Sequence, residues 1–264
     1  MAHENASIEQ AAEKLYLAHT TGTPCAPIRD LLPEGDLEAA YAVQNINTQR
    51  FLDAGHTLVG RKIGLTSKAV QQQLGVSQPD YGMLLDSMDV PEGEDIPWSK
   101  CHQPKAEAEI AFIMADDLNS DHLTSADVLA SIDFAVAALE IVGSRVNNWD
   151  IGITDTVADN ASSGLYVLGQ QPRRLGEFDP RLCGMVMERK GEPISVGAGA
   201  ACLGSPITAT LWLAKVMARV GRPLGKGDVV LSGALGPMVG VNPGDVVEAR
   251  IEGLGSVRAS FTSE

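Results

Sequence analysis

The first 57 residues carry apolar side chains at helical spacing. In residues 8–19 the apolar positions recur every three or four residues, after Ser7 and a glutamine three residues later, which is the spacing of a capping box. A second helical pattern over residues 37–55 follows Asp36, a residue type that commonly caps helices. Glycines and prolines separate the two patterns. We therefore predict a small helical N-terminal region over residues 1–57.

Strand patterns dominate residues 58–264. The runs are short and bounded by Gly, Pro or Asp, and one pair reads as a hairpin that turns at Lys190–Gly191. One long helix is expected over residues 205–221, with Pro206 near its start. Because strands and helices do not alternate regularly, the pattern favours the α+β class over a doubly wound parallel sheet. The strand-rich segments are residues 57–67, 106–115, 133–143, 183–197, 225–237 and 242–261.

Two glutamates lie two residues apart inside the apolar run QPKAEAEIAF, residues 103–112. In a strand, Glu107 and Glu109 would project from one face and repel each other. A third carboxylate, Glu140, ends another apolar stretch, where a charge is costly to bury unless it is paired or bound to a metal. Hard divalent cations prefer oxygen ligands, so these three residues are a candidate metal site. The alternative is that the first two face solvent from an edge strand and that Glu140 pairs with Arg145.

Other polar residues occupy apolar or turn-forming contexts. Lys62, beside Arg61 in the strand-like run VGRKIGLTS, would either balance an anionic ligand or extend its ammonium group to solvent. Asp80, in the turn QPDYG, fits either a backbone cap or a general base that faces a pocket. The polar run DTVADNASSG would either cap a turn or line a site, through Asp159, Asn160 and Ser162.

Composition narrows the class of protein. The chain has 264 residues, of which 44% are hydrophobic, and this is enough for one large domain with a core. A formal net charge of −14 disfavours nucleic acid and anionic membrane surfaces as partners. The four cysteines are scattered without a CxxC pair, which is typical of reduced thiols. The polar N-terminus and the lack of a run of about eighteen apolar residues lead us to expect a cytoplasmic protein without a membrane span.

Seven short motifs occur in one order along the chain: GRKIGLTS, QQQLGVSQPDYG, KAEAEIAF, ALEIVGSR, DTVADNASSG, LSGALGPM and EGLGSV. In this order and spacing the chain resembles the fumarylacetoacetate-hydrolase-fold superfamily. Within it, the chain resembles the 2-hydroxypenta-2,4-dienoate hydratases of bacterial aromatic meta-cleavage pathways. The resemblance implies a helical N-terminal region over residues 1–57 and a catalytic domain over residues 58–264. That domain would be a β-rich mixed sandwich or roll.

The resemblance also implies the parts of an active site. Mg²⁺ or Mn²⁺ would be held by Glu107, Glu109 and Glu140, which would offset the repulsion between their charges. The substrate would chelate the ion through its C1 carboxylate and C2 oxygen. Lys62 would stabilise charge on the C2 oxygen, and Asp80 would activate the water that adds at C4. The expected substrate-binding and supporting residues are Arg61, Leu74, Gly75, Ser162, Asp159 and Asn160.

Two other activities stay open from the sequence. The 4-oxalocrotonate (2-oxo-3-hexenedioate) decarboxylases share the fold and the metal site, but loss of CO₂ needs no base that handles water, so Asp80 favours hydration. A non-catalytic partner of that decarboxylase is the second alternative, and the intact glutamates and Lys62 argue against it. The resemblance further implies a homo-oligomer and a possible complex with the decarboxylase.

Overall fold

Two long helices form the N-terminal region. The computed structural model describes residues 2–73 and 75–264. Helices α1 (Ala2–Thr21) and α2 (Leu37–Asp53) pack against each other, and the Asp36 side chain caps α2 by accepting a hydrogen bond from the backbone N–H of Ala39. The capping box predicted at Ser7 is wrong. Helix α1 already begins at Ala2, because residues 2–6 contain no proline or glycine that would stop it.

The rest of the described chain forms two sheets with a few helices. The seven-stranded sheet has the order β2-β1-β9-β4-β5-β6, with β10 also paired to β4, and the five-stranded sheet has the order β3-β12-β11-β7-β8. Most pairs are antiparallel, and the two parallel pairs are β1–β9 and β12–β3. The strands of the larger sheet are β1 (Leu58–Gly64), β2 (Asp80–Leu85), β4 (Lys105–Met114), β5 (Ile132–Val142), β6 (Leu165–Leu168), β9 (Val229–Leu231) and β10 (Val239–Gly240). Those of the smaller sheet are β3 (Asp95–Ile96), β7 (Gly184–Arg189), β8 (Glu192–Ala198), β11 (Val246–Ile251) and β12 (Gly255–Phe261), and the remaining helices are α3 (Lys68–Gln73), α4 (Ser125–Ala130), α5 (Ile153–Ala158) and α6 (Pro206–Arg219).

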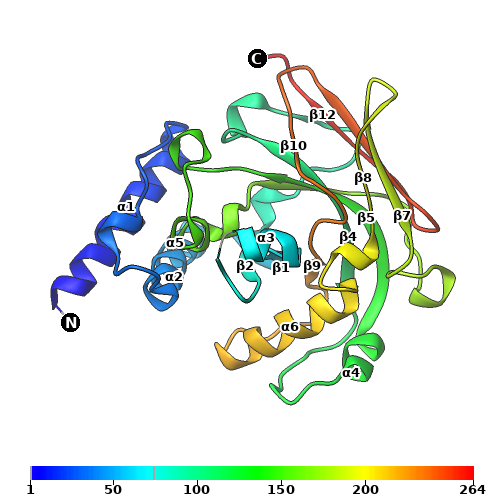
Figure 1. Cartoon of the computed structure of the whole chain (residues 1–264), viewed down its shortest axis with the longest axis horizontal. Coiled ribbons are helices and arrows are strands. Elements are labelled where there is room, and N and C mark those ends of the chain that lie inside the picture. The colour runs from blue at the N-terminus through cyan, green and yellow to red at the C-terminus, as the bar shows by residue number, and fades with distance from the viewer. Residues whose placement is uncertain (1, 74) are drawn as a thin grey trace.

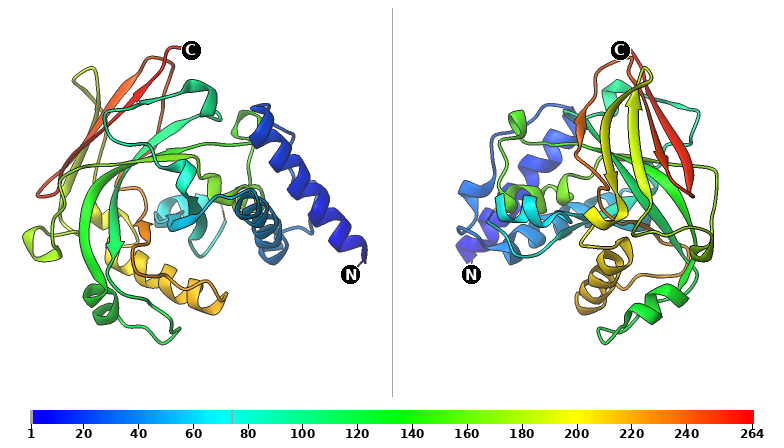
Figure 2. Two further views of the ribbon diagram at one scale, coloured as in Figure 1. Left: turned by 180° about the vertical axis from the view of Figure 1, so that it is seen from behind. Right: turned by 45° about the vertical axis from the view of Figure 1, so that its right-hand side comes forward.

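The main core lies where the two sheets and helix α6 meet. Alternate side chains of β4, such as Ile110 and Phe112, join Met187 and Val257 of the smaller sheet in one buried cluster. Leu213 of α6 belongs to the same cluster. Figures 1 and 2 show the smaller sheet against one side of β4 and β5, with α1 and α2 on the other side. This packing leaves the second face of β4 free to carry polar side chains.

A second, smaller core ties the N-terminal helices to the remainder of the chain. Leu15 of α1 and Val43 of α2 pack with Val157 of α5. The buried side-chain amide of Gln44 donates hydrogen bonds to the carbonyl oxygens of Tyr81 in β2 and Val157. The N-terminal helices therefore cover one flank of the larger sheet. The domain boundary between residues 57 and 58 stays a prediction.

The α+β class and most of the expected elements are confirmed. The hairpin turns at Lys190–Gly191 between β7 and β8, and α6 begins at Pro206. The alternative that Glu107 and Glu109 face solvent from an edge strand is wrong. Strand β4 is an interior strand that pairs with β5 on one side and with β9 on the other. By length and composition only, one segment of the described chain, Gly199–Arg219, would suffice to cross a membrane. Its apolar character is used here in the core, where α6 buries seven residues.

Candidate metal centre and active site

Three carboxylates converge on the polar face of the larger sheet. Glu107 and Glu109 project from the same face of β4, and Glu107 lies directly opposite Glu140 in the antiparallel register of β5. One carboxylate oxygen from each of the three residues lies within 4.8 Å of the others. Glu109 and Glu140 are buried, and Glu107 is partly exposed. Two segments about thirty residues apart therefore bring three like charges to one point.

The electrostatics of this cluster are unfavourable for carboxylates on their own. Burial and, to a smaller extent, the charge of Glu140 together raise the pKa of Glu107 to about 7. Burial likewise raises the pKa of Glu109 well above its usual range, and the charges of Glu140 and Glu107 add to this effect. Glu109 Oε2 accepts a hydrogen bond of 2.7 Å from the backbone N–H of Gly233, but Glu109 Oε1 and both oxygens of Glu140 accept none. Such buried acceptors are rare unless a ligand satisfies them.

Lys62 provides the positive charge at the cluster. It lies in β1, which joins β4 through β9, and its register with Leu231 places it on the same face as the glutamates. Its Nζ lies 3.2 Å from Glu140 Oε1, and its side chain is only 4% exposed. Burial alone would lower the pKa of this lysine, but the surrounding carboxylates, Glu140 foremost, raise it overall. Lys62 is therefore a buried, fixed cation, and the alternative that it extends its ammonium group to solvent is wrong.

Asp80 stands at the start of β2, opposite Gly64 of β1. A Cβ atom at Gly64 would lie 2.1 Å from Asp80 Oδ1, so only glycine leaves room for this carboxylate. Both Asp80 oxygens are buried without a hydrogen-bond partner, and burial raises the pKa of Asp80 to about 6 despite the opposing effect of Lys62. A carboxylate with a pKa close to neutrality is suited to accept and return a proton.

A strained turn brings Ser162 to the same place. Asn160, Ala161 and Ser162 all have left-handed backbone angles, with φ values of 54°, 52° and 56°. Such angles are unfavourable for residues other than glycine and persist where the surroundings enforce them. The Ser162 hydroxyl is buried and has no hydrogen-bond partner in the protein.

One cavity of about 640 Å³ is lined by Lys62, Asp80, Glu107 and Ser162, which form its polar end. Glu109 and Glu140 lie beside Glu107 but do not line the cavity themselves. The other residues that line it are Ile63, Gly64, Leu65, Thr66, Ser67, Lys105, Val142, Trp149, Ile151, Thr156, Ala161, Ala201, Ala234, Gly236, Pro237 and Met238. The cavity thus joins a charged end to a wall that is largely apolar, as small-molecule sites commonly do.

The donor set fits a hard divalent cation. Three carboxylates supply oxygen ligands, and three of their oxygens are buried without hydrogen-bond donors. Two of the residues are almost fully enclosed, so a cation would offset repulsion that water cannot screen. No other group of three His, Cys, Asp or Glu side chains in the described part of the chain has this spacing.

Comparison with known proteins places this arrangement in a family. Residues 59–262 match the family described as fumarylacetoacetate (FAA) hydrolase C-terminal. The chain belongs to this family. A solved structure, 4-oxalocrotonate decarboxylase from Pseudomonas putida G7 in complex with magnesium and adipate, is similar with a TM-score of 0.93 at 36% sequence identity, over 97% of this chain and 98% of that chain.

Relatives of higher sequence identity than this decarboxylase are named as hydratases. The TodF product hydratase of Pseudomonas putida is 64% identical, over 97% of this chain and 95% of its own length. The 2-keto-4-pentenoate hydratase of Paraburkholderia xenovorans is 55% identical, again over 97% of this chain and 95% of its own length. The resemblance seen in the sequence motifs is therefore confirmed at the level of the family and of the hydratase relatives.

Other predicted site residues lie away from the cavity. Arg61 follows the strand alternation to the opposite face of β1, in register with Val230, and its Nη1 donates to the carbonyl oxygen of Gly60. It lines no part of the cavity, so its predicted contact with substrate is not supported by its position. Gly75 is an exposed turn residue that does not line the cavity either. Leu74 lies outside the described residues.

The side chains of the two supporting residues, Asp159 and Asn160, face away from the active-site cavity. The Asp159 carboxylate pairs with Arg145, and both side chains are 4% exposed. The alternative pairing of Arg145 with Glu140 is therefore wrong. The Asn160 side chain accepts a hydrogen bond from Met83 N–H and donates one to Met83 O, as a neighbouring strand would.

Sequence reasoning missed Lys105 and Trp149, which stand on the wall of the cavity. Lys105 Nζ lies 4.1 Å from the centre of the Trp149 ring, a cation–π contact. Lys105 shares the strand parity of Glu107 and Glu109, so the alternation of β4 would have placed it on this face. Trp149 has a left-handed φ of 55°, which its residue type does not predict, so the sequence did not indicate where its side chain would lie. Its indole N–H donates a hydrogen bond to the carbonyl oxygen of Gln103.

Proposed function

We propose that this protein is a metal-dependent hydro-lyase that hydrates 2-hydroxypenta-2,4-dienoate to 4-hydroxy-2-oxopentanoate. The observation that carries the proposal is the convergence of three carboxylates beside a buried lysine, at a cavity that Glu107, Lys62 and the buried Asp80 line together. The relatives named as hydratases, at 55% and 64% identity over nearly the whole chain, support the reaction type. The substrate belongs to aromatic meta-cleavage catabolism in the family that the sequence resembles.

Glu107, Glu109 and Glu140 are the residues that would hold the ion, with Mg²⁺ or Mn²⁺ the expected choice. The solved decarboxylase was obtained with magnesium, which supports a divalent cation in this fold. When bound, such an ion supplies Lewis-acid stabilisation of negative charge on the C2 oxygen of the substrate. The register of β4 and β5 places the three glutamates around this point.

The chain's own residues account for the remaining chemistry. The fixed ammonium of Lys62 stabilises the negative charge that the C2 oxygen carries when the enol proton leaves it and C5 gains a proton, and again when water adds at C4. Asp80 accepts a proton from the water that adds at C4 and returns it to C3, which completes the 2-oxo acid. A base whose pKa is about 6 is largely ionised at neutral pH and can still return its proton. The free hydroxyl of Ser162 donates a hydrogen bond to the substrate carboxylate.

Asp80 and the relatives favour hydration over decarboxylation of 4-oxalocrotonate. An ultraviolet assay of dienol disappearance separates the activities when both substrates are offered, with and without Mg²⁺. We expect Mg²⁺-dependent hydration, and Asp80→Asn to lower kcat by about 10²-fold or more while the metal still binds. Decarboxylation without hydration would replace the proposal, and turnover of neither substrate would point to the non-catalytic partner.

The remaining predictions concern the setting of the enzyme. A homo-oligomeric state and a complex with 4-oxalocrotonate decarboxylase follow from the resemblance, a cytoplasmic location is expected from the polar N-terminus, and nucleic acid and membrane partners are not expected. Size-exclusion chromatography with light scattering, of the protein alone and mixed with the decarboxylase, tests both assemblies. A monomer that elutes separately from the decarboxylase would contradict them.

A further inference from the structure

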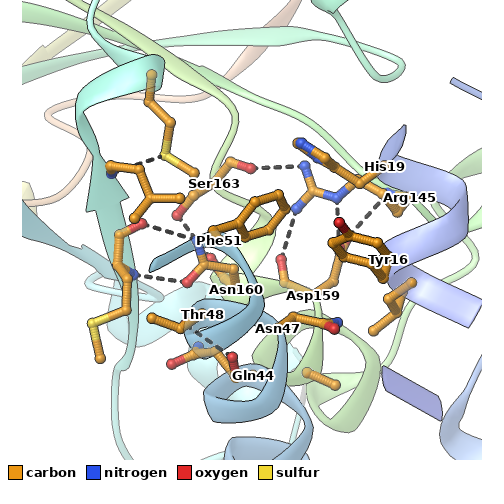
Figure 3. A pocket seen from close by; sticks show the side chains of 15 residues that line it. Tyr16, His19, Gln44, Asn47, Thr48, Phe51, Arg145, Asp159, Asn160 and Ser163 are labelled. Carbon is orange, nitrogen blue, oxygen red and sulfur yellow. Dashed lines mark hydrogen bonds and ion pairs between the residues drawn. The ribbon is translucent and has the colours of Figure 1, made fainter. Parts of the chain in front are cut away.

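The turn that carries Ser162 separates two cavities. On one side Ala161 and Ser162 line the active-site cavity. On the other side Asp159, Asn160 and Ser163 face a small cavity of about 40 Å³ between the turn and helices α1 and α2. Figure 3 shows this second side, with the Arg145 guanidinium extended across it toward Asp159 and Ser163. The turn is therefore held from behind by groups that do not face the substrate.

Arg145 contacts both ends of the turn. Its Nη2 donates a hydrogen bond of 2.7 Å to the carbonyl oxygen of Asp159, and its Nη1 donates one of 2.7 Å to the carbonyl oxygen of Ser163. Its Nε and its backbone N–H donate to the two carboxylate oxygens of Asp159. One buried arginine thus fixes the residues that precede and follow the three left-handed positions.

The middle of the turn is held by a separate anchor. The Asn160 side chain makes two hydrogen bonds to the backbone of Met83, and Asn160 O accepts one of 2.7 Å from Ser163 Oγ. The turn lies so close to β2 that a Cβ atom at Gly82 would be 2.4 Å from both Asn160 O and Ser163 Oγ. Gly82 pairs with Lys62 in the sheet, so this contact fixes the turn relative to the lysine.

We propose that Arg145 is a positioning residue, which holds the strained turn so that the Ser162 hydroxyl points into the cavity toward the substrate carboxylate. Left-handed backbone angles are disfavoured for residues other than glycine. Without the two bonds at its ends, the turn relaxes toward ordinary backbone angles and the hydroxyl moves away. The inference rests on the proposed function for the identity of the ligand, a 2-oxo or 2-hydroxydienoic acid. It adds a residue that contacts neither the ligand nor the carboxylate cluster.

A double-mutant cycle tests whether Arg145 acts through Ser162. Ser162→Ala removes a hydrogen bond to a charged group, and we expect KM to rise about tenfold. Arg145→Lys keeps the charge beside Asp159 but not the fork that reaches both carbonyl oxygens, so KM should rise to a similar degree with kcat changed less. The double variant should resemble Ser162→Ala within about twofold, because the second change acts on a hydroxyl that is already absent. Effects that multiply to about a hundredfold, or an unchanged KM in Arg145→Lys, would overturn the proposal.

Two further variants separate positioning from general stability. Asn160→Ala releases the other anchor without leaving a buried charge, and its KM effect should also vanish in the Ser162→Ala background. Arg189→Lys is the matched control. This arginine likewise joins a carboxylate and a backbone carbonyl, those of Asp245 and Gly240, but contacts no residue of the turn. It should lower the melting temperature and leave KM unchanged.

The same variants should be compared in a binding assay that needs no turnover. We would measure the Kd of 2-oxopentanoate, a saturated analogue, by calorimetry in the presence of Mg²⁺. The same coupling between Arg145 and Ser162 is expected in Kd. If the wild-type protein binds the analogue but does not hydrate the dienoate, the proposed function fails while the coupling still decides the positioning role. If the analogue binds with no coupling, the positioning role fails by itself.

Discussion

Two buried charged clusters lie on either side of the Ser162 turn, and they differ in how completely their hydrogen bonds are made. In the first, Arg145 and Asp159 satisfy each other through side chain and backbone, and no oxygen of Asp159 is left without a donor. In the second, five carboxylate oxygens of Asp80, Glu109 and Glu140 are buried without a hydrogen-bond donor, and only Glu140 Oε1 lies within ion-pair distance of Lys62. A cluster with all its hydrogen bonds made stabilises its surroundings, whereas one with many unmade is typical of a ligand-binding site.

The completeness of hydrogen bonding, and not residue type, distinguishes a charged cluster with a structural role from one with a functional role. Both clusters contain carboxylates, a cation and nearly complete burial. Burying charge is costly in either case, and only complete pairing offsets the cost within the protein. In the carboxylate cluster a divalent cation and the substrate would complete the pairing. Mutations in the carboxylate cluster should therefore act chiefly on kcat/KM, and mutations of Arg145 or Asp159 chiefly on stability, with a smaller effect on KM through Ser162.

The largest expected effect is on activity, from Glu109→Gln. Loss of one charged ligand should lower kcat/KM by about 10³-fold or more, because Lewis-acid stabilisation is worth several kcal/mol. The metal-free protein should not be destabilised, because one of three repelling charges is removed. Steady-state kinetics with Mg²⁺ and urea denaturation check both parts. Glu188→Gln, which removes a partner of Arg250 on β7, is the control and should keep its activity; activity of Glu109→Gln within tenfold of wild type would contradict the metal role.

Asp159→Asn, unlike Glu109→Gln, should act chiefly on stability. It leaves the Arg145 guanidinium buried without its counter-charge, which is expected to lower the free energy of unfolding by about 3 kcal/mol. Urea denaturation measures the loss. Asp245→Asn is the comparison, because its partner Arg189 has a side chain that is 27% exposed, and a pair nearer the surface should cost about 1 kcal/mol or less. Equal losses in the two variants would mean that burial does not distinguish these pairs.

Metal binding should sharpen the contrast further. An ion that binds only the folded state stabilises it by about 2.7 kcal/mol at a concentration of 100 times Kd. We therefore expect Mg²⁺ to raise the melting temperature of the wild-type protein and EDTA to reverse the shift. In Glu109→Gln the shift should disappear, whereas in Arg189→Lys it should persist. A shift that survives in Glu109→Gln would place the ion elsewhere.

The smallest expected effect is on stability at acidic pH, through the two histidines next to Arg145. His19 stacks on His102, with ring centres 5.1 Å apart. Burial, with a contribution from the Arg145 charge, lowers the pKa of His19 to about 3 and that of His102 to about 4. The folded state holds both neutral below pH 6.5 while the unfolded chain takes up protons, so stability present above pH 6.5 is lost as the pH falls.

His19→Gln should remove part of this loss. Between pH 7.5 and 5.5 the decrease in the free energy of unfolding should shrink by about 1 kcal/mol relative to wild type. Urea denaturation at the two pH values measures it. His122→Gln, at a side chain that is 94% exposed, should leave the decrease unchanged. An unaltered pH dependence in His19→Gln would mean that the folded state does not hold His19 neutral.

The helices and strands were predictable because their signals are local. Asp36 before a helical pattern, Pro206 at a helix start and Lys190–Gly191 between two strand runs each act within a few residues. The start of α1 was not predictable in this way, because residues with the spacing of a capping box, such as those at Ser7, can also lie inside a helix that continues through them. The three glutamates were found from strand parity and from the cost of burying a charge, both of which the sequence displays.

Arg61 shows where such reasoning ends. It is adjacent to Lys62 in the sequence and equally buried, yet strand alternation turns it toward the core that contains Val230. The pairing of Arg145 with Asp159, and not with Glu140, depends on a left-handed turn that no residue type announces. Trp149 reaches the cavity through a loop of the same kind.

The sequence by itself determined which residues could carry the chemistry, since periodicity, capping and the isolation of charges in apolar runs are properties of neighbouring positions. Only the tertiary structure decided which of those charges meet, because the register of β4 with β5 and the insertion of β9 between β1 and β4 join segments that are distant along the chain. It also decided which of them stay unpaired. That distinction depends on every donor within hydrogen-bond distance, and these donors come from segments whose positions no local pattern specifies.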